Sequence, residues 1–285
     1  MGTMTTEDLR IALQIKEAET RNKQLEVQAK EAETRNKQLE ISYIISQQEN
    51  DHAIPLDMVK DSVDDMYSDC KPQMMQNVKH KYFDRENRGV FQKVWKKAET
   101  CAMKKTKQKD KEDAALTKDH LKAICVYTSS HPKFYELFNA AVRTNRTEYV
   151  TTFPFHSMHF WLTSAIQILN NNKKCFTVYR RSNLMFTGKV NQLIRFGFFT
   201  STSKRTDLYH FGVKTCFEIQ TCHGAYLKKY PCLGDREEEV LIPPYEMFKI
   251  AKKKSRKLTR CKVIYVLESI GFYSNLNCKA AKIDY

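Results

Sequence analysis

The chain has 285 residues, of which 41% are hydrophobic and 28% are charged. This length allows one sizeable core with an appendage but hardly two full domains, and the composition is that of a globular protein. No run of about 18 apolar residues is present, which excludes a membrane-embedded protein. The eight glycines include no GxG pair, so the glycine-rich phosphate loops of Rossmann folds, P-loops and kinases are excluded as well.

The formal net charge is +15, from 48 Lys and Arg against 33 Asp and Glu. Two basic runs, residues 93–111 and 249–262, carry much of this charge, and the second contains no acidic residue. Such runs attract polyanions through a field that salt screens. Solvated lysines that keep the protein soluble are the alternative, which we favour for the first run. Neither run has the interleaved aromatic residues of a nucleic-acid interface, so we expect no specific nucleic-acid binding.

The N-terminal segment contains a helical repeat. The sequence KEAETRNKQLE occurs at 16–26 and again at 30–40, an offset of two heptads. Its apolar seam would bury Asn22 and Asn36, which favours a two-stranded coiled coil that pairs two copies of the chain through residues 9–43. A single solvated amphipathic helix fits the pattern equally well, because the seam is rich in alanine. In both cases we expect a helical extension over residues 1–50.

A linker around residues 46–56 separates this extension from a folded domain at 57–285. From about 57 to 170, apolar residues recur at helical spacing, with breaks at Pro132 and Pro154. From 175 onward the pattern changes to short β-rich runs between turn residues. The sequence therefore predicts an α+β fold, in which a helical half packs on a compact β-sandwich-like core.

Three segments of the β-rich half combine polar residues with strand context. Arg180 and Arg181 end one strand, residues 200–203 form a hydroxyl cluster after an apolar run, and Glu237 and Glu239 precede another strand. Arginine binds phosphate through forked hydrogen bonds. The two glutamates stand at alternate positions, so both can face one cleft. Paired carboxylates suit sugar transfer, because one can stabilise an oxocarbenium-like state while the other orients or deprotonates the nucleophile.

Each segment alone is a weak signal, but together they resemble the signature of the arginine-specific mono-ADP-ribosyltransferases of the ecto-enzyme type. Residues 178–180 read VYR, residues 195–203 read RFGFFTSTS and residues 237–248 read EEEVLIPPYEMF. The resemblance covers about 57–280 and leaves out the N-terminal repeat. It implies an NAD-binding core and an enzyme that transfers ADP-ribose from NAD or NADP to arginine residues of acceptor proteins and releases nicotinamide, without a metal.

The resemblance also implies a role for each signature residue. Arg180 is similar to the arginine that binds the NAD phosphate and the nicotinamide ribose, and Ser201 to the serine that binds this ribose and supports the catalytic acid. Glu239 is similar to the catalytic glutamate. Glu237 is similar to the residue that engages the acceptor guanidinium, and family relatives with Gln at this place tend towards NAD hydrolysis.

Two positions depart from the family pattern. Phe198 stands where Gln is common, and Pro231 follows Tyr230 where many relatives have Ser. We expect Phe198 and Tyr230 to contact NAD, with Tyr230 in a substrate-facing loop at 226–236. The departures either lower the affinity for NAD or reshape the loop without loss of activity. The alternative functions are an NAD glycohydrolase, in which water replaces the guanidinium, and a catalytically silent coiled-coil interaction module.

The nine cysteines stand without CxxC pairs, which indicates disulfides or core thiols rather than zinc ligands, and their odd number leaves at least one unpaired. The resemblance implies bridges between Cys175 and Cys222 and between Cys70 and Cys278. Reduced thiols are the alternative if the protein stays in the cytosol. The remaining cysteines receive no assignment: Cys101, Cys125, Cys216, Cys232 and Cys261.

The sequence leaves the compartment open. An Asn145-Arg146-Thr147 sequon and the cysteines of the family favour the secretory route and a cell-surface or secreted enzyme. The apolar run of a signal peptide and the apolar tail of an anchor are both missing, which favours the cytosol. Gly2 and Thr6 also fit a myristoylation pattern, although this short motif has many false matches.

Overall fold

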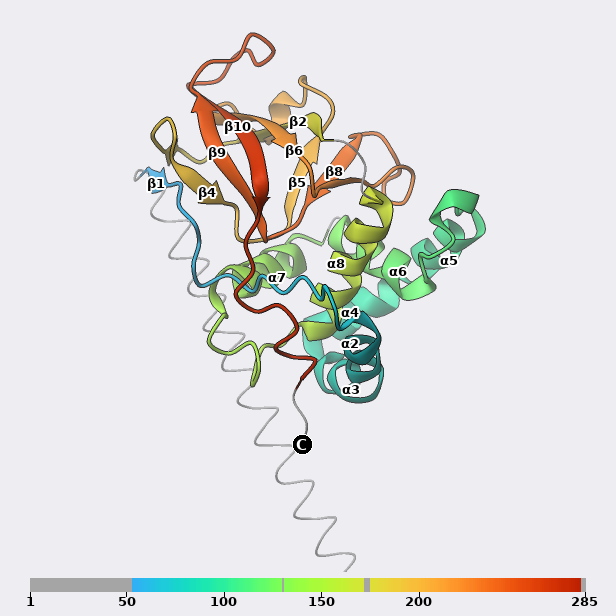
Figure 1. Ribbon diagram of the computed structural model, residues 1–285. Helices are drawn as coiled ribbons and strands as arrows, with labels where there is room; N and C mark the ends of the chain where they lie inside the picture. The colour runs from blue at the N-terminus through green and yellow to red at the C-terminus, as the bar shows by residue number, and fades with distance from the viewer. Residues whose placement is uncertain (1–52, 130, 172–174, 283–285) are drawn as a thin grey trace, which may run out of the picture. The chain divides into compact units, whose positions relative to one another are not determined.

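The computed structural model describes residues 53–129, 131–171 and 175–282. The predicted coiled coil at 9–43 lies outside these residues. The described part is an α+β unit, in which helices α2 to α8 precede strands β2 to β10 along the chain and gather on one side of them (Figure 1). The predicted order of a helical half followed by a β-rich half is therefore confirmed.

The helical half is built around α8 (His156–Asn170), which is buried along most of its length because apolar residues occur on all its faces. Trp161 of this helix stacks on Trp95 of α4, with ring centroids 4.8 Å apart. No helix of the described segments is long and apolar enough to span a bilayer. The other helical elements are α2 (Lys71–Asn77), the π-helix η1 (Val78–Tyr82), α3 (Phe83–Glu86), α4 (Gly89–Lys97), α5 (Glu99–Lys107), the 3₁₀ turn η2 (Lys111–Asp113), α6 (Lys118–Tyr127) and α7 (Pro132–Thr144).

Residues 57–70 are not helical, contrary to the expectation for this segment. Asp64 and Asp65 are buried there, and their carboxylates bind backbone amides near the other end of the domain. Asp64 Oδ1 accepts from the amide of Asn275 at 2.9 Å, and Asp65 Oδ1 accepts from that of Cys278 at 2.9 Å. The apolar spacing of this segment reflects burial of an irregular chain, in which side chains rather than a helix satisfy the polar groups.

The strands form one sheet of eight strands in the order β4-β9-β10-β6-β2-β5-β8-β7, beside a parallel pair of β1 and β3. Within the large sheet, β10 and β6 run parallel and the other neighbours run antiparallel. The strands are β1 (Ile54–Pro55), β2 (Phe176–Ser182), β3 (Phe186–Thr187), β4 (Leu193–Arg195), β5 (Thr200–Ser203), β6 (Thr215–Thr221), β7 (Ala225–Tyr226), β8 (Glu239–Ile242), β9 (Glu246–Lys252) and β10 (Val263–Phe272).

The sheet curves around its own apolar side chains. Ile194 of β4, Ile219 of β6 and Val240 of β8 belong to one buried cluster, although β4 and β8 lie near opposite ends of the strand order. Between β4 and β5 the chain turns at Gly197, whose φ of +71° favours glycine. A Cβ atom at this position would lie 2.5 Å from the side chain of Val59. The strand containing the hydroxyl cluster therefore starts from a turn that only glycine fits.

Four disulfides occur in the described part of the chain. The two bridges implied by the resemblance, Cys70–Cys278 and Cys175–Cys222, are confirmed. The cysteines without an assignment form Cys101–Cys125 and Cys216–Cys261, and Cys232 is unpaired and exposed. The first bridge joins residues 208 positions apart, so it removes a large amount of entropy from the unfolded chain and stabilises the domain by a few kcal/mol.

Candidate active site

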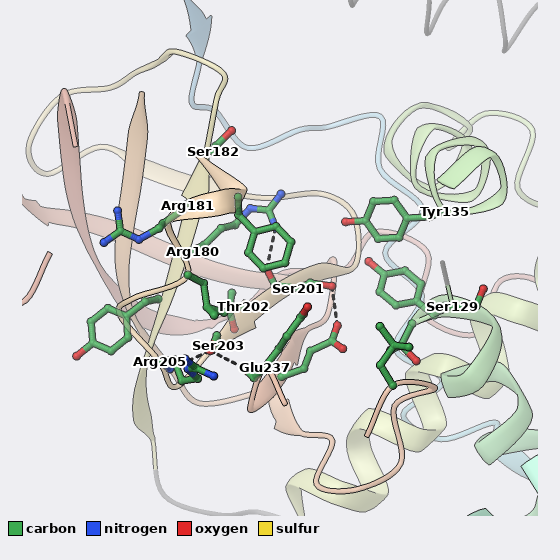
Figure 2. A pocket seen from close by; sticks show the side chains of 17 residues that line it. Ser129, Tyr135, Arg180, Arg181, Ser182, Ser201, Thr202, Ser203, Arg205 and Glu237 are labelled. Atoms are coloured by element: carbon green, nitrogen blue, oxygen red, sulfur yellow. Dashed lines mark hydrogen bonds between the residues drawn. The ribbon is translucent and has the colours of Figure 1, made fainter. Parts of the chain in front are cut away.

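A pocket of about 480 Å³ opens between the strands β2, β5 and β8 and the ends of helices α6 and α7. Figure 2 shows Arg180, Ser201 and Glu237 on the strand side, and Ser129 and Tyr135 facing them from the helical half. The lining residues are Tyr127, Thr128, Ser129, Tyr135, Tyr179, Arg180, Arg181, Ser182, Ser201, Thr202, Ser203, Arg205, Leu208, Phe211, Leu233, Glu237 and Glu239.

The strand order brings the arginine, the serine and the second glutamate into contact. Strand β5 lies between β2 and β8, so Ser201 stands between Arg180 and Glu239. Arg180 Nη1 donates to the carbonyl oxygen of Ser201 at 2.7 Å, and Ser201 Oγ donates to Glu239 Oε1 at 2.8 Å. A cation, a hydroxyl and a carboxylate therefore follow one another across three adjacent strands.

Glu237 and Glu239 both line the pocket, as the sequence predicts, but the geometry that places them differs from the expected one. Strand β8 begins only at Glu239, and Glu238 has a φ of +44°. The carbonyl oxygen of Glu237 accepts a hydrogen bond from Ser203 Oγ at 2.5 Å. A left-handed turn anchored on β5, rather than the alternation of an extended strand, thus directs both carboxylates to the same side.

Burial raises the pKa of Glu239 to about 7, and the nearby charge of Glu237 also raises it. The hydrogen bond from Ser201 acts in the opposite direction, because it stabilises the ionised carboxylate. Glu239 thus changes its charge near neutral pH. A carboxylate so placed can stabilise positive charge that develops on a substrate in a site partly shielded from water.

Arg181 also lines the pocket, but most of its hydrogen-bonding capacity is used within the protein. Its Nη2 donates to the carbonyl oxygen of Thr206 at 2.7 Å, and its Nη1 donates to that of Thr259 at 3.2 Å. The guanidinium lies 4.4 Å from the ring centroid of Tyr209. Arg181 therefore holds two loops beside the pocket, whereas Arg180 has the freer guanidinium.

The structure does not bring Phe198 and Tyr230 to the pocket. Tyr230 is buried, its hydroxyl donates to Asp113 Oδ2 at 2.7 Å, and it accepts from the amide of Asp110 at 3.1 Å. Phe198 packs against both apolar clusters of the domain, and the Arg143 guanidinium lies 5.8 Å from its ring. Tyr230 is buried and Phe198 is half-buried, and neither is among the residues that line the pocket.

Several lining residues were not predicted from the sequence. Tyr127 and Tyr135 form one wall, with ring centroids 5.1 Å apart, and Tyr127 OH donates to the carbonyl oxygen of Phe199. Phe211 and Leu233 line the pocket with exposed fractions of 46% and 61%. Thr128 and Ser129, which follow the apolar run of α6, were the available sequence signal for this wall of the pocket. The sequence contains no comparable signal for the aromatic and apolar lining residues, because contacts between distant segments bring them to the pocket.

The fold and the site define a class of protein. The sequence model of the family described as NAD:arginine ADP-ribosyltransferase matches residues 56–272, which include every strand that lines the pocket. The chain therefore belongs to this family. Its affiliation agrees with the resemblance found in the three signature segments.

The relatives of the chain include ADP-ribosyltransferases whose names describe them as ecto-enzymes or as GPI-linked. It is 33% identical over 259 residues to mouse GPI-linked NAD(P)(+)-arginine ADP-ribosyltransferase 1, covering 85% of this chain and 78% of the relative. It is 32% identical over 243 residues to human ecto-ADP-ribosyltransferase 4, covering 80% and 74%. A crystal structure of the eukaryotic mono-ADP-ribosyltransferase ART2.2, a glutamate variant with NADH, matches with a TM-score of 0.67, 28% identity and coverage of 79% and 98%.

A second structure of ART2.2, another glutamate variant in complex with NAD, matches with a TM-score of 0.66 and 27% identity over 79% of this chain and 98% of that chain. The pocket described above has the chemistry that such a dinucleotide requires. Its lining contains an arginine, which can bind phosphate, hydroxyl and carboxylate groups, which can bind ribose, and the partly exposed ring of Phe211, which can stack on a planar heterocycle.

Proposed function

We propose that this protein transfers ADP-ribose from NAD to the guanidinium group of arginine residues in acceptor proteins and releases nicotinamide. The observation that carries the proposal is the unbroken contact of Arg180, Ser201 and Glu239 across β2, β5 and β8 in a chain of this family. Glu237 lies in the same pocket and supplies the second carboxylate.

The geometry supports different roles for the two carboxylates, with Glu239 acting on the ribose and Glu237 on the acceptor guanidinium. The bond between the nicotinamide nitrogen and the ribose carbon breaks, its electron pair stays on nicotinamide, and positive charge develops on the ribose. Ionised Glu239, oriented by Ser201, stabilises this charge. A guanidinium nitrogen of the acceptor then attacks the carbon, and Glu237 orients the guanidinium and accepts the proton that it loses.

Arg180 is suited to bind the diphosphate of the dinucleotide. Arginine has five N–H donors, and the bond from Arg180 Nη1 to Ser201 leaves other donors of the fork available to phosphate oxygens. Because Ser201 joins Arg180 to Glu239, binding of the diphosphate is linked to the carboxylate that acts on the ribose. This arrangement holds the reacting carbon in place.

Replacement of Glu237 with Gln tests the proposal directly. With labelled NAD and agmatine, a small guanidinium acceptor, we expect the wild type to label agmatine. The variant should release nicotinamide by hydrolysis while labelling of agmatine falls by on the order of 10²-fold, because the base that serves the guanidinium is lost and Glu239 remains. If neither protein consumes NAD, the proposed function is wrong. If the variant labels agmatine as well as the wild type does, the role of Glu237 is wrong.

We infer that the protein works in an oxidising compartment, at the cell surface or outside the cell. The four disulfides and the names of the ecto and GPI-linked relatives support this location. The sequon does not add support, because Asn145 is buried at the end of α7 and its side-chain oxygen accepts from Thr144. A glycan needs a more accessible asparagine.

Thiol titration of the native protein tests the oxidised state. We expect one reactive thiol, that of exposed Cys232, because the other eight cysteines are bridged. After denaturation, the count should stay at one without a reductant and rise to nine with it. Protein prepared from culture medium that already shows several thiols before reduction would contradict the inferred compartment.

A further inference from the structure

The loop between β9 and β10, residues 253–262, is both strongly basic and fixed in place; it is the orange loop at the top of Figure 1. Leu258 in this loop is buried, Cys261 is bridged to Cys216, and Ser255 Oγ donates to Glu218. Its exposed basic residues, with the last residue of β9, are Lys252, Lys253, Lys254, Arg256, Lys257, Arg260 and Lys262. We call these residues the basic loop.

The charges of the basic loop are not balanced by its surroundings. No acidic residue occurs from 249 to 262, and none of the basic side chains forms an ion pair with another of the described residues. Like charges held close together repel one another, and this repulsion is relieved when an anionic partner binds. The fixed backbone keeps the attachment points of these side chains close together.

The basic loop lies next to the mouth of the pocket. The carbonyl oxygen of Thr259 accepts from Arg181, which lines the pocket, at 3.2 Å. The Arg260 guanidinium lies 5.1 Å from the ring centroid of Tyr209, the first residue of the 3₁₀ turn η3 (Tyr209–Phe211). Phe211, the last residue of this turn, lines the pocket. Arg181 and the turn η3 therefore connect the basic loop to the lining of the pocket.

We propose that the basic loop is a docking surface for an acidic segment of the acceptor protein, which places a neighbouring arginine of that acceptor at the pocket. The proposal rests on the proposed function and names the class of acceptor. An arginine is itself a cation, and a chain with a net charge of +15 repels it at long range. Acidic residues near the arginine reverse this repulsion and bind to the basic loop.

The position and the contacts of the basic loop favour a protein partner over a membrane or a nucleic acid. A flat bilayer bound to the loop would also cover the adjoining pocket mouth and block the approach of an acceptor. Binding of single-stranded nucleic acid relies on aromatic rings that are free to stack on bases. The ring of Tyr209 is already contacted by two guanidinium groups, from Arg181 at 4.4 Å and Arg260 at 5.1 Å.

Two matched triple variants of the full chain test the proposal. The loop variant carries Lys254→Gln, Arg256→Gln and Lys257→Gln, which are exposed residues of the basic loop. The control variant carries Lys93→Gln, Lys96→Gln and Lys97→Gln, which are exposed on α4, and no residue of α4 lines the pocket. Both variants lose the same number of charges and keep the lining residues.

Three acceptors are compared with each protein at low and at physiological salt. They are agmatine, a peptide with one arginine joined to a run of glutamates by linkers of increasing length, and the same peptides with glutamines in place of the glutamates. The measured quantity is kcat/KM for acceptor labelling at saturating NAD. In the wild type, we expect the acidic peptide to be preferred over the neutral one by on the order of tenfold at low salt, and salt should weaken this preference.

The loop variant should lose the preference for the acidic peptide, whereas the control variant should keep it. Labelling of agmatine should be the same in both variants as in the wild type. Equal losses in both variants would overturn the proposal, because net charge alone would then explain the effect. The proposal would also be overturned if the wild type labelled the acidic and the neutral peptides equally well. If such a protein sedimented with phosphatidylserine vesicles and the loop variant did not, the basic loop would bind a membrane instead. Failure of every protein to label agmatine would instead refute the proposed function.

Discussion

Replacement of Glu239 with Gln is expected to lower kcat/KM for ADP-ribose transfer by on the order of 10² to 10³. Gln has nearly the same size, and its side-chain oxygen can still accept the hydrogen bond that Ser201 Oγ donates to Glu239 at 2.8 Å. What the variant lacks is the negative charge that stabilises the ribose as nicotinamide leaves. Nicotinamide release and agmatine labelling should therefore fall together, unlike in the Glu237→Gln variant.

A stability measurement separates lost chemistry from a damaged fold. The folded pKa of Glu239, about 7, lies above its ordinary value of 4.5, so the folded protein holds this proton more tightly than the unfolded chain does. The contribution of Glu239 to stability is therefore complete below about pH 4.5 and is lost as the pH rises through 7. Gln carries no such titration. At pH 8 the variant should exceed the wild type in free energy of unfolding by on the order of 1 to 3 kcal/mol. A variant that is less stable than the wild type at pH 8 would mean that the lost activity reflects the fold.

The same carboxylate sets the pH dependence that we expect of the wild type. Only ionised Glu239 stabilises positive charge, so kcat/KM for NAD should rise with pH and level off above about 7. The charge of Glu237 contributes to the raised pKa, so the Glu237→Gln variant should reach its plateau at a lower pH when nicotinamide release is followed. A flat profile in the wild type would contradict the assigned role of Glu239.

Replacement of Asp64 with Asn is expected to destabilise the domain by about 3 to 5 kcal/mol. The side chains of Asp64 and Arg195 are fully buried, with Nη1 and Oδ2 2.6 Å apart. Asn would leave the charge of Arg195 buried without its counterion, which is the costly way to break such a pair. It would also weaken the acceptor for the amide of Asn275, which ties the end of the domain to its start. Urea denaturation of the oxidised protein measures the loss.

Asp207→Asn is the matched control, because it makes the same chemical change in an exposed ion pair. Asp207 lies 2.8 Å from Arg205, and both side chains are open to solvent. Water screens this pair, so we expect no measurable change in the free energy of unfolding. If the two variants unfolded at the same urea concentration, the buried ion pair of Asp64 would contribute no more to stability than the exposed pair of Asp207, which would contradict the prediction.

The site residues that lie on strands can be predicted from the sequence. The site residues that reach the pocket through contacts between distant segments cannot. Arg180, Ser201 and Glu239 each stand in or at the start of a short β-rich run, and such runs become strands. Apolar spacing records that a segment is buried but not what covers it. It therefore could not place Tyr127 and Tyr135 in the wall of the pocket, since α6 and α7 approach the sheet from the other half of the chain.

The differences at residues 57–70 and at Tyr230 have a related cause. In the first segment, buried carboxylates bind backbone amides of residues more than 200 positions away, which no local pattern reveals. The polar residues next to Tyr230 in the sequence indicate an exposed turn. In the structure Tyr230 is buried, and Asp113 accepts a hydrogen bond from its hydroxyl. Cysteine spacing likewise could not assign Cys101, Cys125, Cys216 and Cys261, because partners are chosen by the folded geometry.

The bridge between Cys70 and Cys278 gives the domain a particular response to mechanical load. Nearly all of the helical half and the whole large sheet lie between these residues in the sequence. A pulling force applied at Cys70 and at Cys278 passes through this covalent bond and bypasses the segment between them. Tension between these two residues would thus leave the strands that contain Arg180, Ser201 and Glu239 in register, because these strands lie within the bypassed segment.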